Sequence, residues 1–129
     1  MSIELFDVLT YDTTKATGVL DIGEVYQNIA TLVTPSRPAG KYEVSFAFTW
    51  ALASANKSAY MRWQLNGLGW NEFRGEPKDA TDIYARYYGF PYDFAAGVKT
   101  LEFEARKEDS QAGQFDITFL DLIIKRVGA

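Results

Sequence analysis

The sequence predicts an all-β fold: an antiparallel, jelly-roll-like β-sandwich of about eight strands, with residues 1–129 forming a single domain. Two segments alternate strictly between apolar and polar residues, which is the side-chain period of a strand. Turn-forming Gly, Pro and Asn separate the apolar segments, and no convincing amphipathic helix interrupts them. The strand count, a long first connection and the lack of a Cys…Trp…Cys pattern favour a jelly roll over an immunoglobulin fold.

The centre of the prediction is the segment Gly40–Leu65. Its first half places five large residues on one face of a strand, which requires a second sheet to bury them: Tyr42, Val44, Phe46, Phe48 and Trp50. Its second half repeats the pattern with Ala59, Met61, Trp63 and Leu65. Residues 51–58 between them contain turn formers and weak strand formers. They indicate either a long hairpin or a crossover between two sheets.

The N-terminal part alternates less clearly. Residues 3–10 are expected to form a strand, and residues 11–23, rich in Thr, Asp and Gly, a surface loop or arm with room for a short strand at 18–22. Residues 24–34 predict another strand whose imperfect alternation fits a bulge or a short helix. Pro35, Pro38 and Gly40 end this segment, because proline cannot donate to a strand ladder and glycine turns easily.

The C-terminal half begins with a hairpin turn predicted at Asn66-Gly67, since both central residues of a type I′ turn need positive φ. Residues 75–81 are expected to form a polar loop, and residues 91–97 a connection. The final apolar segment has hydrophobic residues on both faces, which is typical of a strand in the middle of a sheet. The strands of this half are expected at residues 68–74, 82–90, 98–107 and 115–127.

The composition excludes several classes of protein. The chain has no Cys and no His, which excludes disulfides, thiolate or histidine zinc sites and the usual triads of acyl transfer. The net charge is −4 and the basic residues are scattered, so nucleic-acid binding is not expected. No apolar segment has the roughly 20 residues of a membrane helix, and the acidic N-terminus does not resemble a signal peptide. We therefore expect a soluble protein with no membrane partner.

The carboxylates give little indication of catalysis or metal binding. Glu102 and Glu104 lie two apart on one strand, but Arg106 continues the same row, which is typical of a solvated face. Glu76, Asp79 and Asp82 in the 76–82 loop could offer oxygens to calcium, but their spacing matches no known calcium loop and Lys78 lies among them. The sequence therefore predicts no catalytic, metal or cofactor residues and no enzyme, with calcium in this loop left open.

Aromatic residues make up 16% of the chain and are the best candidates for binding. Tyr84 and Tyr88 fall on one face of a strand and Tyr87 on the other, so both sets cannot face one core. The surplus is expected to form a protein interface, a sugar platform or plain core packing. The interface candidates are Tyr84, Tyr87, Tyr88, Tyr92 and Trp70, and the sugar-platform candidates are Trp63, Trp70 and Tyr88.

Several segments together resemble small virion proteins of tailed bacteriophages. They are VYQNIATLVTPSRPAGKYEVSFAFTW, SAYMRWQLNG, the W-x-E-F-x-x-EPKD-x-TD loop of residues 70–82, and the ending VKTLEFEARKE followed by FDITFLDLIIKR. They span most of residues 25–126. β-Sandwich modules of this kind occur as head decoration or cement proteins and as tail or fibre components.

The resemblance implies a structural, non-enzymatic virion protein, with head decoration or cement favoured over tail or fibre. It implies a homo-oligomer, with a trimer as one option, that binds other virion proteins and no cofactor. Production in the reducing bacterial cytoplasm agrees with the absence of Cys. The alternative is a carbohydrate-binding module that uses exposed aromatic rings.

Overall fold

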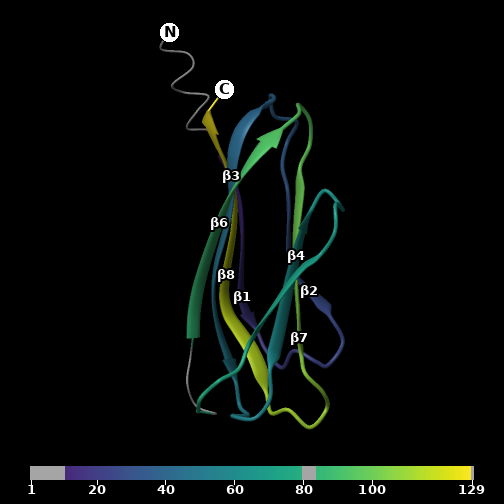
Figure 1. Cartoon of the computed structure of the whole chain (residues 1–129), viewed down its shortest axis with the longest axis vertical. Coiled ribbons are helices and arrows are strands. Elements are labelled where there is room, and N and C mark those ends of the chain that lie inside the picture. Colours follow the sequence, from purple (N-terminus) through teal and green to yellow (C-terminus); the bar gives the residue numbers. More distant parts are fainter. Residues whose placement is uncertain (1–10, 80–83, 129) are drawn as a thin grey trace.

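The computed structural model describes residues 11–79 and 84–128, except for the side chains at 11, 17 and 84–88. Within these ranges the chain forms eight strands and no helix, arranged as two facing antiparallel sheets (Figure 1). The expected strand at residues 3–10 lies outside the described residues. The strands are β1 (Tyr11–Val19), β2 (Gln27–Val33), β3 (Gly40–Leu52), β4 (Ala59–Leu65), β5 (Asn71–Gly75), β6 (Tyr84–Phe94), β7 (Thr100–Lys107) and β8 (Phe115–Gly128).

The topology is that of a jelly roll, as the sequence predicted. One sheet has the order β1-β8-β3-β6 and the other β2-β7-β4-β5. The chain passes from one sheet to the other at every connection except the one between β4 and β5. The segment after β3 is therefore a crossover between sheets and not a hairpin. Because β1 faces β2 at one side and β6 faces β5 at the other, these four strands form the two edges of the sandwich in the described part of the chain.

The core lies between the two sheets and is rich in aromatic rings. The large-residue faces predicted for β3 and β4 are buried, and so are the alternating residues Leu101, Phe103 and Ala105 of β7. Phe46 lies near the centre, with its ring centroid 5.4 Å from that of Phe103 and 5.9 Å from that of Trp63. Phe73 of β5 and Phe90 of β6 extend this cluster to the edge of the sandwich. Burying these large apolar surfaces stabilises the two layers against each other.

β8 contains a bulge that explains why its sequence is apolar on both faces. Phe115 and Ile117 are buried, and then the phase changes so that Leu120 and Leu122 are buried instead. The pairing of β8 with β3 shifts at this point, between Thr49 and Trp50. An extra residue in one strand reverses the alternation that follows it. β8 also lies centrally, between β1 and β3, as predicted.

The second segment of imperfect alternation is also a bulged strand. β2 pairs with β7 in a register that shifts between Asn28 and Ala30, which leaves Ile29 as the extra residue. Ile29, Ala30 and Leu32 are all buried. The open choice between a bulge and a short helix is therefore settled in favour of the bulge.

The surface loop or arm expected at 11–23 is wrong for most of its length. Residues 11–19 form β1, which pairs with β8 along the edge of its sheet, and the chain leaves the strand only at Leu20. An edge strand needs little apolar surface, and the β-branched Thr residues suit an extended backbone. Asp12 also accepts two hydrogen bonds from the Arg37 guanidinium, at 2.7 and 3.1 Å, which connects β1 to the segment before β3.

The Asn66-Gly67 turn forms as predicted, with φ values of 52° and 68° and a hydrogen bond of 3.1 Å from the Leu68 amide to the Leu65 carbonyl. The next strand, however, begins at Asn71, since pairing between β4 and β5 starts only at Trp63 opposite Asn71. The connection expected from Pro91 is also wrong: β6 continues through it to Phe94. β6 is the edge strand of its sheet, where a missing N–H can face outward without breaking the ladder.

Candidate functional site

A crevice opens at the edge of the sandwich where β6 faces β5. Its volume is about 330 Å³, and it is lined by Trp63, Leu65, Leu68, Gly69, Trp70, Asn71 and Tyr92. All but Tyr92 come from the end of β4, the turn after it and the start of β5. The crevice exists because β5 has only five residues while β6 has eleven, so part of β6 has no β5 partner in the facing layer.

Three aromatic residues reach the crevice from different directions. Trp63 is an inward residue of β4, 4% exposed, and its ring stacks on Phe90 with centroids 5.0 Å apart. Tyr92 packs against the core from β6 and stacks on Phe94 at 5.8 Å. Trp70 comes just before β5 and is partly exposed. Trp63 therefore forms part of the base, while Trp70 and Tyr92 form walls.

Trp70 is held in place by Arg62 on the outer face of β4. The guanidinium carbon of Arg62 lies 4.1 Å from the centroid of the Trp70 ring and 4.0 Å from that of Tyr26, so it is packed between two aromatic faces. Glu104 of β7 accepts hydrogen bonds from Nε and Nη2 of Arg62, at 2.8 and 2.5 Å. A planar guanidinium can make both kinds of contact at once. The Trp70 ring is thus fixed before any ligand arrives.

Tyr26 extends this stack and was not predicted from the sequence. Its hydroxyl donates to Glu72 of β5, and Arg106 lies 5.2 Å from its ring centroid. Burial, followed by the hydrogen bond to Glu72, raises the pKa of Tyr26 well above its usual value. Arg106 also lies 4.2 Å from the ring centroid of Tyr60. Rings and guanidinium groups therefore alternate across the outer face of this sheet.

Polar atoms in the crevice are few but available. The side-chain nitrogen of Asn71 donates to the carbonyls of Trp63 and Gly69 at 3.4 and 3.5 Å, which leaves its Oδ1 as an acceptor. Among the described residues, no hydrogen bond is made by the Tyr92 hydroxyl or the Trp70 indole N–H. None of the described side chains that line the crevice is charged. The arrangement can bind a neutral molecule that has both apolar and hydroxyl surface.

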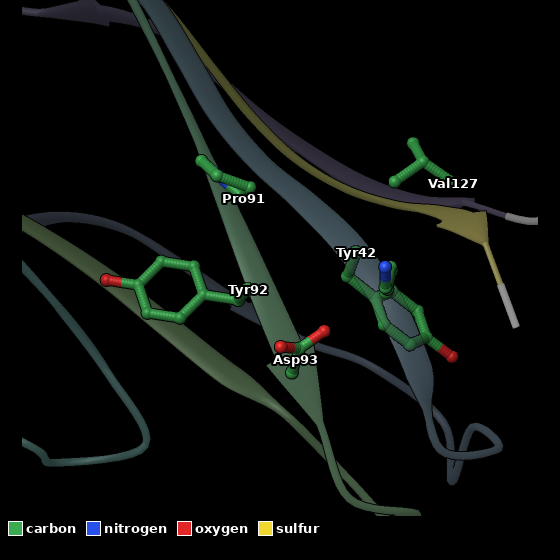
Figure 2. A pocket seen from close by; sticks show the side chains of 6 residues that line it. Tyr42, Pro91, Tyr92, Asp93 and Val127 are labelled. Carbon is green, nitrogen blue, oxygen red and sulfur yellow. The ribbon is translucent and has the colours of Figure 1, made fainter.

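A second hollow of about 330 Å³ lies across β6, β3 and β8 (Figure 2). Pro91 and Val127 lie on opposite sides of it, and Lys41 faces Asp93 in the register of β3 and β6. Figure 2 shows the ring of Tyr92 projecting away from Val127, toward the other side of β6. Tyr92 thus borders both hollows, but its ring belongs to the crevice.

The structure brings together Trp63, Trp70 and Tyr92 from the two sets of sequence candidates. Trp63 cannot act as an exposed sugar platform, because its alternating position in β4 turns it into the core. Tyr84, Tyr87 and Tyr88 lie in β6, but their side chains are outside the described residues.

The carboxylates have structural roles where they are described. Glu102 accepts a hydrogen bond from Gln64 at 3.1 Å and Glu104 binds Arg62, which agrees with their prediction as a polar outer face. Of the 76–82 loop, Asp82 lies outside the described residues. In the described ranges, no group of three or more Asp or Glu side chains is placed to hold a metal ion.

Comparison with known proteins relates the fold to viral capsid proteins. No protein-family model and no curated protein sequence matches the chain. Among solved structures, a chain of the infectious bursal disease virus Gx strain is similar with a TM-score of 0.62 and 10% identity, covering 92% of this chain and 32% of that chain. VP2 of a subviral particle of the same virus has a TM-score of 0.60 and 6% identity, covering 91% of this chain and 33% of its own.

The PRD1 vertex protein P5 is similar over more of its own length. Its TM-score is 0.55 at 6% identity, and the match covers 92% of this chain and 73% of P5. This chain spans about a third of the infectious bursal disease virus chains. At such low identity the likeness establishes the fold: a β-sandwich shared with viral capsid and vertex proteins. In the described residues, no helix has the length and hydropathy needed to cross a membrane.

Proposed function

We propose that the chain is a non-enzymatic structural protein of a tailed-phage virion that associates with itself and with capsid or tail proteins. The observation that carries this proposal is its strand order, β1-β8-β3-β6 facing β2-β7-β4-β5, in a fold shared over 92% of the chain with a viral vertex protein. The phage-like segments noted in the sequence support the same proposal. A head decoration or cement role is the form of this proposal that the resemblance favours.

The open edge at β6 supports association with other subunits. β6 is eleven residues long and rich in aromatic residues, and among the described strands only β3 pairs with its backbone. Rings at a sheet edge provide large contact area with little loss of side-chain entropy. Pro91 interrupts the row of donors along this edge, so we expect contact through side chains and not a continuous intermolecular sheet.

Immunogold electron microscopy of purified particles tests the proposal. Antibody against this chain should label the heads of virions produced by cells that carry the gene, and a stop codon in the gene should remove the label. Labelling of tails would contradict the decoration role, and particles free of the chain would contradict the virion role. Light scattering of the purified chain should give a multiple of the monomer mass.

Carbohydrate binding is the second candidate function. The observation that favours it is the crevice between β5 and β6, whose aromatic walls and unpaired polar atoms suit a sugar ring. Such a role is compatible with a place in a virion, since a jelly roll serves in both capsid and lectin domains.

A further inference from the structure

We propose that the crevice between β5 and β6 binds a single neutral pyranose ring of a glycan, with Trp70, Asn71 and Tyr92 as the recognising residues. The inference rests on carbohydrate binding as the second candidate function, and the particle role does not depend on it. It differs from the platform predicted from the sequence. The ligand enters between the two sheets and does not lie on an exposed aromatic surface.

The size of the crevice sets the size of the ligand. A volume of about 330 Å³ lies at the lower end of the roughly 300–1,000 Å³ that small-molecule sites occupy. This is enough for one sugar ring and part of its neighbour. The crevice opens at the edge of the sandwich, so the rest of a glycan chain can continue into solvent.

The walls match the apolar faces of a sugar. The C–H groups of a pyranose ring carry partial positive charge, and the face of an aromatic ring is negative, so the two stack favourably. The guanidinium carbon of Arg62 lies 4.1 Å from the centroid of the Trp70 ring and covers part of its surface. The part of the indole that Arg62 does not cover is available to line the crevice. Glu104 fixes Arg62 in turn. A preorganised wall lowers the entropic cost of binding.

The unpaired polar atoms decide between a sugar and an apolar side chain of a neighbouring protein. Asn71 Oδ1 is an acceptor, the Trp70 indole N–H is a donor, and the Tyr92 hydroxyl can act as either. An apolar occupant that covered these atoms would separate them from water without replacing their hydrogen bonds, which is unfavourable. Sugar hydroxyls can satisfy all three. The described lining residues carry no charge, which favours a neutral sugar over an acidic one.

The test is a titration of the ¹⁵N-labelled full-length chain with methyl α-glucopyranoside, methyl α-mannopyranoside and methyl β-galactopyranoside, followed by NMR. Saturable shifts are expected at the Trp70 indole and the Asn71 side-chain amide for at least one of these sugars, with Kd of about 1–10 mM for a single ring. Tyr92→Phe should weaken binding several-fold, because it removes only the unpaired hydroxyl. Tyr60→Phe, the same change on the outer face away from the crevice, should leave the affinity unchanged.

Trp70→Ala and Asn71→Ala should weaken binding by tenfold or more, and the dispersed spectrum of each variant shows whether it is folded. The proposal is overturned if none of the three sugars gives saturable shifts, or if binding survives in Trp70→Ala and Asn71→Ala alike. Saturable shifts that map outside the crevice would overturn this site but retain carbohydrate binding. Shifts that depend on protein concentration and not on sugar would identify a subunit contact and also overturn the site.

Discussion

Replacing Arg62 with Lys tests whether the stack on the outer face stabilises the sheet. Lysine keeps the positive charge but cannot lie flat between two rings or donate from two nitrogens to Glu104. Arg62 and Glu104 are 26% and 17% exposed, so both groups are largely shielded from solvent. Losing about 0.5 kcal/mol at each ring and about 1 kcal/mol from one charge-assisted hydrogen bond gives a total loss of about 2 kcal/mol.

Urea unfolding followed by circular dichroism measures this loss of unfolding free energy. In thermal unfolding, a chain of this length should show a Tm lower by about 6–10 °C. Arg74→Lys is the matched control, because Arg74 is an exposed residue of the neighbouring strand β5. Combining Arg62→Lys with Trp70→Ala should reveal a coupling energy of about 0.5–1 kcal/mol. A stability change at Arg62 no larger than at Arg74, or additive effects with Trp70, would refute the reasoning.

Three further changes test the core and one loop contact. Leu122→Ala removes a fully buried side chain of the central strand β8 and should lower the free energy of unfolding by about 2–5 kcal/mol in urea titrations. In Gly75→Ala the added Cβ would overlap the Trp50 indole, and calorimetry should show a loss of about 1–3 kcal/mol. Lys57 donates to Asp109 at 2.7 Å and holds the pKa of that carboxylate below its usual value. The folded state therefore gains stability above the unfolded pKa of Asp109 and loses it as pH falls through the folded pKa. Lys57→Gln should thus be less stable than wild type at neutral pH, and pH-dependent melting curves of the two should converge on acidification. A difference that grows on acidification would contradict this sign.

Alternation in the sequence was sufficient to predict the core, because a strand buried on one face must place its large residues every second position. Phe46 and Trp63 were assigned to such faces, and both are buried, with Phe46 in ring contact with Trp63 and with Phe103 of β7. β8 was recognised as central for a different reason, because its sequence is apolar on both faces. Its bulge could be located only from its pairing with β3, since the sequence alone gives two equally apolar phases.

Edge strands were the main failure of the sequence prediction. β1 is polar because only part of one face meets the core, and its Thr and Asp residues therefore suggested a loop. Pro91 suggested the end of a strand, but at the edge of a sheet its missing N–H has no ladder partner to lose. In both cases the strand depends on a neighbour that is distant in the sequence. β1 pairs with β8 about a hundred residues later.

The candidate site could be predicted only in part. Trp70 and Tyr92 were singled out for their residue type, but they are 22 positions apart, and only the packing of the two sheets brings them to one crevice. Asn71 was read as an ordinary strand residue, and Tyr26 carried no signal at all. Tyr26 lies in the connection between β1 and β2, and its ring packs on Arg62 of β4. No local sequence pattern can indicate a contact of this kind.

The position of the crevice follows from unequal strand lengths in a symmetric-looking fold. In this fold β5 and β6 face each other at one edge of the sandwich, and a longer β5 would extend over Tyr92. Residues 66–70 instead form a turn, in which Asn66, Gly67 and Gly69 all have positive φ. β5 therefore begins only at Asn71. The backbone of this turn is therefore constrained where Trp70 must be positioned. Sequence changes in β5 and in the 66–70 turn can therefore alter which ligand the crevice binds. Such changes leave the rest of the two sheets, and any assembly surface on them, unaltered.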